Sequence, residues 1–409
     1  MSMQGGGYYN ENCTLQGLAI DKALSLLEPP KSKGTTITLA DYGSSEGRNT
    51  IRLLANYLSN LPNLSSATLV FNDTPFNDFS SLSRTINTNW SLLSQDGRLP
   101  INPLMVPKSF FGQVLPDDFV DAGFSFTALH WLQHMPSSFE PSDVARYAHE
   151  DLVSFLSARH REIRPKGTLT LCIPCHGQIG VDPAVACLQA SIRSLASTYH
   201  LDPSFTVRLP LYFRTMEEIL SSINAEKGKW MVKSHVTVPI MHPSWSSAVL
   251  DKDSVDMAAR VRYAAGITGF TTAACSRFLT DELGAFPKKR DLDEPALRSG
   301  VLAEATFLED LSACFKDEFL RSYITEEGEA QKSQDLDCPR PAERWIGYQP
   351  LEQEGKYNAS NRTTGGSNAR SKTSTPIEEM PHGGDAGSVE EGAGRAIQNP
   401  KHKHKMPIF

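Results

Sequence analysis

Residues 36–49, TITLADYGSSEGRN, combine a β-branched apolar run, a glycine-rich turn and the start of an amphipathic stretch. This order is typical of a buried strand that passes through a tight turn into a helix. Further apolar runs follow at 67–73, 169–174 and 230–240, with amphipathic stretches between them. Strands that alternate with helices predict a mostly parallel, doubly wound α/β sheet.

Helical periodicity dominates two stretches in the second half of the chain. One lies between the runs at 169–174 and 230–240, and the other covers about 254–323. In the second stretch one apolar stripe is predicted to face inward, formed by Met257, Val261, Ala264 and Ile267. We expect these helices to pack together as a lid over the sheet.

The character of the chain changes near residue 325. From there Gly, Ser, Asn, Glu, Lys and Pro dominate and apolar periodicity ends, which is typical of disorder. No strand is expected after Tyr323. The chain therefore divides into an α/β core over 1–180, a helical lid over 181–325 that also carries the strand at 230–240, and a disordered tail over 326–409.

Charge and composition exclude several classes of protein. The 409 residues carry a formal charge of −7, which disfavours nucleic acid as a partner because phosphate neutralisation needs a concentrated basic face. No run of about 18 apolar residues predicts a membrane span, and the first residues lack the features of a signal peptide. Seven cysteines in this length do not indicate a disulfide framework. We expect a cytoplasmic protein with no membrane partner, and a homodimer remains open.

The turn after the first strand predicts a ligand site, because open α/β sheets bind ligands beyond the carboxyl ends of their strands. Gly43 and Gly47 lack the GxGxxG spacing, and Glu46 sets a carboxylate where a phosphate would bind. Asp41 can instead accept a hydrogen bond from an ammonium, while Gly43 lets a ligand approach the backbone. S-adenosylmethionine has that chemistry. An ordinary turn with a structural Asp is the alternative.

The second strand ends in Asp73, within the sequence ATLVFNDTPFNDF. A carboxylate at this position can accept hydrogen bonds from both ribose hydroxyls of a nucleoside. A solvated Asp at the end of a strand is the alternative. Asp41 and Asp73 together favour a nucleoside-bearing cation more strongly than either residue does alone.

Short motifs spread over residues 1–136 resemble the SABATH methyltransferases, a family that uses S-adenosylmethionine to methylate small carboxylic acids and, in some members, ring nitrogens. The motifs are Tyr9–Gln16 (YNENCTLQ), Asp41–Asn49 (DYGSSEGRN), Phe71–Phe79 (FNDTPFNDF), Val106–Gly112 (VPKSFFG) and Leu129–Leu132 (LHWL). A weaker similarity covers Leu209–Tyr212, ahead of Glu217 and Glu218. The resemblance implies a Rossmann-like methyltransferase sheet, S-adenosylmethionine as cofactor, and methylation of a small-molecule acid to its methyl ester in secondary metabolism.

The resemblance also implies which residues bind the cofactor. They are Asp41 and Asn49 at the methionine end, Asp73 at the ribose, Ser109 and Phe110 at the adenine, and in addition Gly43 and Thr74. The chemistry agrees with this assignment, because Phe110 offers a ring for stacking and Ser109 a hydrogen-bonding group for the adenine edge.

For the substrate, the resemblance implies that Gln16 and Trp131 bind the carboxylate; the other implied substrate-binding residues are His130, Thr127 and Tyr9. Gln16 and Trp131 each supply an N–H donor. Neutral donors suit the task, since a full positive charge would overstabilise a carboxylate that must lose its charge in the reaction. Gln16 falls in the first turn of a predicted helix whose inward positions are Leu15, Ala19, Ala23 and Leu27.

Two positions depart from the family pattern. Cys13 stands where the family usually has Ser, and Thr127 stands where an aromatic ring usually walls the substrate pocket. A Thr enlarges the cavity or moves its wall to Phe126, which predicts a substrate bulkier than a single-ring benzoate. The alternatives to carboxyl methylation are N-methylation of a heterocycle and a homologue that binds the cofactor without turnover.

Two further patterns suggest metal or haem chemistry. His130 and His134 have the spacing of paired metal ligands on a helix, but the Glu of HExxH and a third ligand are missing. Cys172–His176 matches the CxxCH haem pattern, at the end of an apolar strand. We expect no metal and interpret both thiols as packing residues. Carboxyl methylation also needs no general base, since a carboxylate is already ionised at pH 7.

Overall fold

The structure is a computed structural model. It describes residues 3–24, 27, 34–61, 63–135, 140–175, 181–202, 204–240, 242–244, 256–283, 294–324 and 344–353. All of these residues belong to one compact unit, Met1–Tyr357. No helix within the described ranges is long and apolar enough to cross a membrane.

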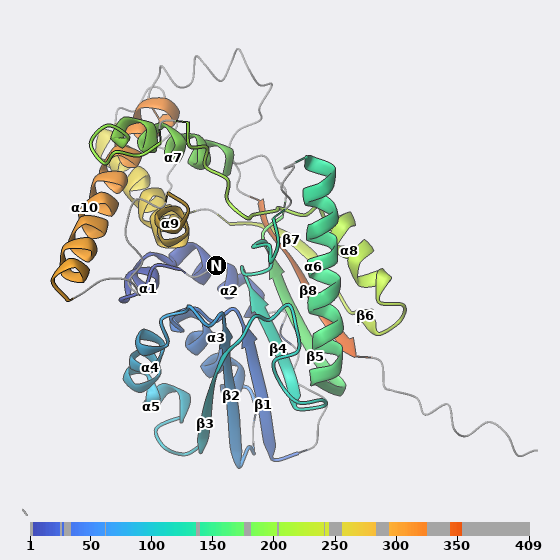
Figure 1. Cartoon of the computed structure of the whole chain (residues 1–409). Helices are drawn as coiled ribbons and strands as arrows, with labels where there is room; N and C mark the ends of the chain where they lie inside the picture. Colours follow the sequence, from blue (N-terminus) through green and yellow to red (C-terminus); the bar gives the residue numbers. More distant parts are fainter. Residues whose placement is uncertain are drawn as a thin grey trace, which may run out of the picture. The chain divides into compact units, whose positions relative to one another are not determined.

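A mixed sheet forms the centre of this unit (Figure 1). Its strands are β1 (Thr36–Tyr42), β2 (Ser66–Asp73), β3 (Ile101–Pro107), β4 (Val120–Phe126), β5 (Ile163–Ile173), β6 (Trp230–Val232), β7 (Val236–Pro239) and β8 (Arg344–Gln353). They lie in the order β3-β2-β1-β4-β5-β8-β6, and β7 also pairs with β8. The first five strands are parallel, whereas β8 is antiparallel to its neighbours. The direction of winding reverses between β1 and β4, the point where open α/β sheets form their ligand crevice.

Helices cover both faces of the sheet and its carboxyl end (Figure 1). One face carries α2 (Thr14–Leu24) and α3 (Arg48–Ser59), with α4 (Phe79–Thr88) and α5 (Trp90–Leu93) beside α3. The other face carries α6 (Pro141–Glu162) and α8 (Met216–Ala225). The helical lid contains α7 (Val181–Leu195), α9 (Met257–Leu283), α10 (Glu294–Phe319) and a π-helix (Leu320–Ile324), and α1 (Tyr8–Asn12) contacts α9. This is the predicted doubly wound α/β fold with a helical lid.

The parallel strands form because their sequences suit burial on both faces. β4 is buried along its whole length, and β1 is buried at every residue after Thr36. The sequences of such strands are continuous apolar runs and do not alternate between apolar and polar residues, because helices cover both faces of a parallel sheet. Three apolar clusters result: one on each face of the sheet and a third within the lid.

The run at 230–240 forms two short strands, β6 and β7, and not the single strand predicted. Lys233, Ser234 and His235 separate them. Val232 lies opposite Leu351, and Val236 lies opposite Tyr348. Val236 therefore lies four positions after Val232, whereas their partners on β8 lie three positions apart. The extra residue falls in the polar segment between β6 and β7, an irregularity that apolar content alone does not reveal.

α9 buries a different face from the predicted stripe. Ala264 and Ile267 are buried, but Met257 and Val261 are 49% and 39% exposed. The inward face instead includes Arg260 and several Thr and Ser residues. The prediction failed because it counted aliphatic residues only, whereas this helix packs polar and aromatic side chains against its neighbours.

β8 contradicts both the expectation of no strand after Tyr323 and a tail that is disordered from residue 326. Its sequence contains Gly347 and Pro350, two residues that are unfavourable inside strands. Pairing with Thr168–Ile173 of β5, far earlier in the chain, holds it in the sheet. Local composition cannot show such a distant partner. The rest of the predicted tail lies outside the described residues.

A chain that ends at residue 340 should unfold at a lower temperature than one that ends at Tyr357. Only the shorter chain loses β8, which is the shared antiparallel neighbour of β5, β6 and β7. Unpaired strand edges lose their hydrogen bonds and favour association with other chains. Thermal unfolding followed by circular dichroism compares both with the full chain. Equal melting temperatures of the two shortened chains would contradict this role of β8.

Candidate functional site

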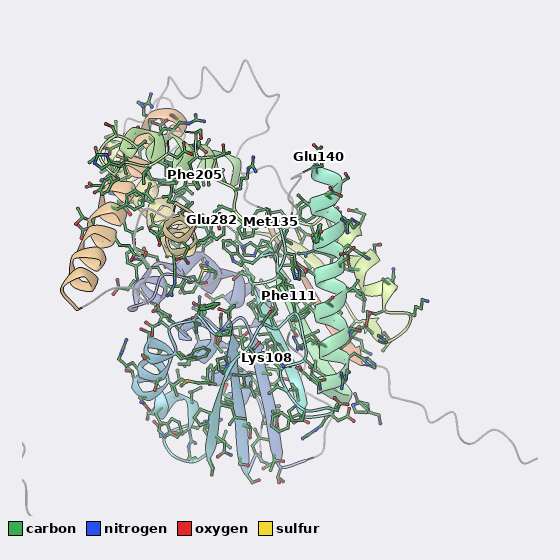
Figure 2. The ribbon with its side chains drawn as sticks, viewed as in Figure 1. Lys108, Phe111, Met135, Glu140, Phe205 and Glu282 are labelled. Carbon is green, nitrogen blue, oxygen red and sulfur yellow. The ribbon has the colours of Figure 1, made fainter. Side chains whose placement is uncertain are left out.

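A cavity of about 260 Å³ lies at the carboxyl ends of β1, β2 and β4, between the sheet and α9. Phe111, one of its lining residues, is labelled beside these strand ends in Figure 2. Most of the predicted site residues line this cavity: Tyr9, Gln16, Gly43, Asp73, Thr74, Ser109, Phe110, Thr127, His130 and Trp131. Asp41 and Asn49 are the two that do not.

Asp41 is buried at the end of β1, beside the cavity wall. Thr50 Oγ1, from the first turn of α3, donates a hydrogen bond to its Oδ2 at 2.5 Å, while Oδ1 has no hydrogen-bond partner among the described residues. Burial raises the pKa of Asp41 to about 7, against the lowering effect of the Thr50 hydrogen bond and with a smaller contribution from the nearby charge of Asp73. The fold therefore holds a carboxyl group that gains from a cation placed next to it.

Asp73 reaches the cavity from the end of β2. Its two oxygens accept backbone hydrogen bonds at 2.7 Å, Oδ2 from Ser45 N–H and Oδ1 from Thr74 N–H. These bonds fix the carboxylate against the turn after β1. Burial still raises the pKa of Asp73 to about 6.

Gly43 brings the turn after β1 against the segment that follows β4. Its φ of 102° lies in the left-handed region, and a Cβ built there would lie 2.5 Å from the Cβ of Ala128. Any side chain would separate the two segments. The predicted need for glycine at this position thus has a steric cause inside the protein, in addition to any approach by a ligand.

Glu46 has a different role from the one expected from its sequence position. Its carboxylate accepts hydrogen bonds from the backbone N–H groups of Gly7 at 2.6 Å and Asn10 at 2.9 Å. These donors lie at the start of α1, where a negative charge is favourable. Glu46 thus fixes the short helix that carries Tyr9. Sequence reasoning missed this contact because the partners are more than 35 residues apart.

Asn49 turns away from the cavity toward the N-terminal helices. Its Nδ2 donates to the carbonyl oxygen of Cys13 at 3.1 Å, just before α2 begins. Gln16, in the first turn of α2, does reach the cavity, and its buried Oε1 meets no hydrogen-bond donor in the part of the chain that the structure describes. The predicted inward positions Leu15, Ala19 and Ala23 are buried.

A buried ion pair supports the loop that carries Ser109 and Phe110. Arg159 on α6 donates to the carbonyl oxygens of Phe110 at 2.6 Å and Gly112 at 2.9 Å, and to Glu162 at 2.8 Å. Both charged side chains are fully buried. Tyr42, next to Asp41, also donates to Glu162 at 2.8 Å. The network ties β1 to this loop, and sequence reasoning missed it because an i,i+3 charge pair usually lies on a helix surface.

His130 and Trp131 lie on an irregular segment after β4, not on a helix. The segment pairs with residues 210–212: Leu132 N–H donates to the carbonyl oxygen of Pro210, and Tyr212 N–H donates to that of His130, both at 2.8 Å. Burial lowers the pKa of His130 to about 3, helped by the charge of Arg214, so its ring is neutral at pH 7. Within the described ranges, Nδ1 of His130 has no hydrogen-bond partner.

Thr127 occupies a strained backbone position at the cavity wall. Its φ is 51°, which is rare for a β-branched residue, and its N–H donates to the carbonyl oxygen of Cys172 at 2.8 Å. Backbone strain of this kind persists only where the surrounding structure holds it, and it is frequent at functional sites. Phe126, the alternative wall named above, also lines the cavity.

The described residues of the rival metal and haem patterns have other surroundings. His134 Nδ1 lies 3.6 Å from Oδ1 of Asp151, a buried carboxylate on α6, while the His134 side chain is largely exposed. Cys172 is buried in β5, where burial raises the pKa of its thiol, and His176 lies outside the described residues. Within the described ranges no three His, Cys, Asp or Glu residues gather as metal ligands.

Several buried polar atoms at or beside the cavity have no hydrogen-bond partner within the described part of the chain. They are Asp41 Oδ1, Ser45 Oγ, Thr74 Oγ1, Gln16 Oε1 and His130 Nδ1. Buried polar atoms are usually paired, so this concentration indicates a polar ligand. Two carboxylates, two hydroxyls and an aromatic ring fit a cationic nucleoside such as S-adenosylmethionine.

Comparison with known proteins identifies the family. The model of the S-adenosylmethionine-dependent carboxyl methyltransferases matches residues 2–147. Methyltransferase FUS9 of Gibberella fujikuroi is 31% identical over 299 residues, which cover 69% of this chain and 83% of that protein. The chain belongs to the S-adenosylmethionine-dependent carboxyl methyltransferases. It transfers a methyl group from this cofactor to the carboxylate of a small-molecule acid.

Two further relatives agree with this family. The farnesoic acid carboxyl-O-methyltransferase of Arabidopsis thaliana is 25% identical over 270 residues, 55% of this chain and 74% of that protein. The solved structure of a loganic acid methyltransferase with SAH has a TM-score of 0.64 at 18% identity, covering 87% of this chain and 99% of that one. At this low identity the structure supports the fold of the methyltransferase and nothing finer.

Asp41→Asn should stabilise the cofactor-free methyltransferase at pH 8. The folded-state pKa of about 7 lies above the usual 3.8, so the folded state binds the proton more tightly than the unfolded state. The stability contributed by this proton is complete below pH 4 and is lost as the pH rises to about 7. Asn cannot ionise, so the variant should avoid this loss of stability at high pH. Each kcal/mol that the unsubstituted protein loses should lower its melting temperature by about 2–4 °C relative to the variant.

Thermal unfolding between pH 4 and pH 8 measures this difference, with Asp96→Asn, a change at an exposed carboxylate, as the matched control. The Asp41 variant and the unsubstituted protein should converge at pH 4 and separate toward pH 8. A pH-independent difference between them would mean that the ionisation of Asp41 does not govern the effect.

Proposed function

We propose that the cofactor lies along the ends of β1 and β2, with Asp41 near its methionine end, Asp73 and Thr74 at the ribose, and Ser109 and Phe110 at the adenine. When bound, S-adenosylmethionine supplies a methyl group activated by a sulfonium ion. The raised pKa values of both carboxyl groups and the unpaired Oδ1 of Asp41 support a cation here.

In this proposal Gly43 allows the close approach of the two turns, and Asn49 acts at one remove. Because the Asn49 amide holds the carbonyl of Cys13, it fixes the start of α2 and therefore the position of Gln16. Tyr9 lines the cavity from α1, and in this proposal it contacts the acceptor acid there. Tyr9 thus keeps the role that the motifs imply, whereas Asn49 positions Gln16 and does not contact the ligand.

We propose that Gln16 and Trp131 bind the carboxylate of the acceptor acid. The observation that carries this proposal is that both line one cavity with Asp73 and Phe110, while none of its described lining residues is Lys or Arg. A carboxylate in this cavity meets neutral donors only. The neutral ring of His130 adds no charge either. Such a site orients the carboxylate without overstabilising its charge before reaction.

The body of the acid is proposed to be largely apolar and larger than a single ring. Phe76, Phe111, Phe126, Leu132 and Phe270 add apolar side chains to the cavity wall. Thr127 lines the same cavity, so the space that an aromatic ring would take is open. The relative named for farnesoic acid, an extended apolar acid, agrees with this class. We propose a cytoplasmic location, which the low cysteine density supports.

Trp131→Phe and Gln16→Leu should each lower kcat/KM, with a loss of about 1–3 kcal/mol in transition-state stabilisation. The reason is that a misoriented carboxylate seldom reaches the line of attack. The two donors serve one geometry, so the double variant should lose clearly less than the sum of the single losses. Steady-state kinetics on the best acid measures all four proteins. Affinity for SAH should stay within about two-fold in each. Full activity of both single variants would remove the proposed acceptor site.

A screen with S-adenosylmethionine labelled in its methyl group tests the chemistry of the product. Carboxylic acids and nitrogen heterocycles are offered in parallel, and the labelled products are treated with alkali. A methyl ester releases labelled methanol, whereas an N-methyl product keeps its label. Alkali-stable label would contradict carboxyl methylation by this chain, and binding of SAH without any transfer would indicate a homologue without turnover.

A further inference from the structure

A second, smaller cavity adjoins the main one near Gln16. Its walls are Leu15, Gln16, Ala19, Thr127, Ile240 and Phe270, and its volume is about 10 Å³. Gln16, Thr127 and Phe270 line both cavities, so the two cavities are neighbours at these three side chains. We call this space the side slot.

The side slot exists because small side chains occupy two of its walls. Leu15 and Ala19 lie one turn apart on the buried face of α2, and Ala19 leaves room where a longer side chain would fill the slot. Thr127 adds a short side chain, directed by its left-handed backbone at φ 51°. Ile240, which follows β7, closes the far end and is 2% exposed.

The size and chemistry of the slot select a small alkyl group. About 10 Å³ is near the space that one water-sized sphere needs. Leu15, Ala19 and Ile240, which line only the slot, offer no hydrogen bonds from their side chains, whereas the polar residues Gln16 and Thr127 lie on the side shared with the main cavity. A single water needs two to four polar partners to bind stably, so the inner part of the slot suits a carbon group better than a water. A methyl group, or the first carbon of an ethyl or ethylidene group, matches both the volume and the apolar wall.

The position of the slot then fixes where this group sits on the acid. Gln16 is the residue proposed to bind the carboxylate, and it also borders the slot. We infer that the acceptor acid carries a one- or two-carbon branch on the carbon next to its carboxyl group, and that the side slot holds this branch. The inference rests on the proposed function of Gln16. It names the substrate class as α-branched, largely apolar acids.

Matched pairs of acids that differ by this branch test the inference. Cinnamic acid is compared with α-methylcinnamic acid, and octanoic acid with 2-methyloctanoic acid, by release of SAH under steady-state conditions. The branched member should have the higher kcat/KM by about ten-fold, the usual discrimination of a pocket that fits one extra carbon. The difference should appear mainly in KM if the slot acts on binding.

Ala19→Leu fills the slot and should remove the preference for the branched acid. Ala274→Leu, which narrows the main cavity from α9 without bordering the slot, is the matched control. It should lower activity on both acids and keep their ratio. Ile240→Ala enlarges the slot, keeps the inference testable if Ala19→Leu does not fold, and should shift the preference from methyl to ethyl branches. Binding of SAH checks that each variant retains its cofactor site.

The outcomes separate the slot from the function on which it rests. Equal kcat/KM for branched and unbranched acids in the unsubstituted enzyme would overturn the slot and leave carboxyl methylation in place. A preference that survives Ala19→Leu and is unchanged by Ile240→Ala would also overturn it. If SAH binds but no acid of either shape is bound or methylated, the proposed acceptor site fails and the slot fails with it.

Discussion

Two carboxyl groups held inside the protein at the ends of adjacent parallel strands determine much of this structure. Asp41 and Asp73 lie at the ends of β1 and β2, where burial raises the pKa of each. The Thr50 hydroxyl on α3 holds Asp41. The backbone N–H groups of Ser45 and Thr74 hold Asp73. Burying an ionised carboxylate is costly unless a partner compensates it. In the proposed cofactor site a cationic cofactor is such a partner, so its binding should stabilise the protein.

The rest of the site is built around this pair by contacts between distant segments. Glu46 fixes α1 from the turn after β1, and Arg159 with Glu162 fixes the loop of Ser109 and Phe110 from α6. The segment of His130 and Trp131 is paired with residues 210–212 at the edge of the lid. Each contact joins parts that are more than 35 residues apart in the sequence, so cofactor and acceptor regions are positioned by one connected framework.

Sequence reasoning predicted the cavity well because its residues are concentrated at strand ends. In a parallel sheet the carboxyl ends of strands meet at one edge, so the predicted strand that ends in Asp73 placed this residue there. Ser109 and Thr127 follow β3 and β4, which the apolar runs did not predict, and only the resemblance to the family named them. Thr50, Glu46 and Arg159 were not predicted, since their importance depends on partners that only the fold brings close. The strand β4 was also difficult to see, because Asp121 interrupts its apolar run; the fold accommodates this residue by pairing it with Arg164.

The errors in the fold prediction have the same origin. β8 is held by pairing with β5 although its own residues disfavour a strand, and α9 turns an unexpected face inward because its neighbours, and not its aliphatic residues, decide its orientation. Asn49 follows the family motif in sequence, yet its amide supports α2 and does not line the cavity. Local patterns therefore located the chemistry, while the supporting contacts required the structure.

Proton release on binding SAH tests most directly whether the buried carboxyl pair forms the cofactor's electrostatic site. Titration calorimetry at pH 6.5, in buffers of different ionisation enthalpy, measures the number of protons exchanged. The account predicts that binding releases protons, because the ammonium of SAH favours the ionised form of a group whose pKa is about 7 in the empty protein, and that Asp41→Asn reduces this release. Binding without proton release, or with an equal release in the variant, would contradict it.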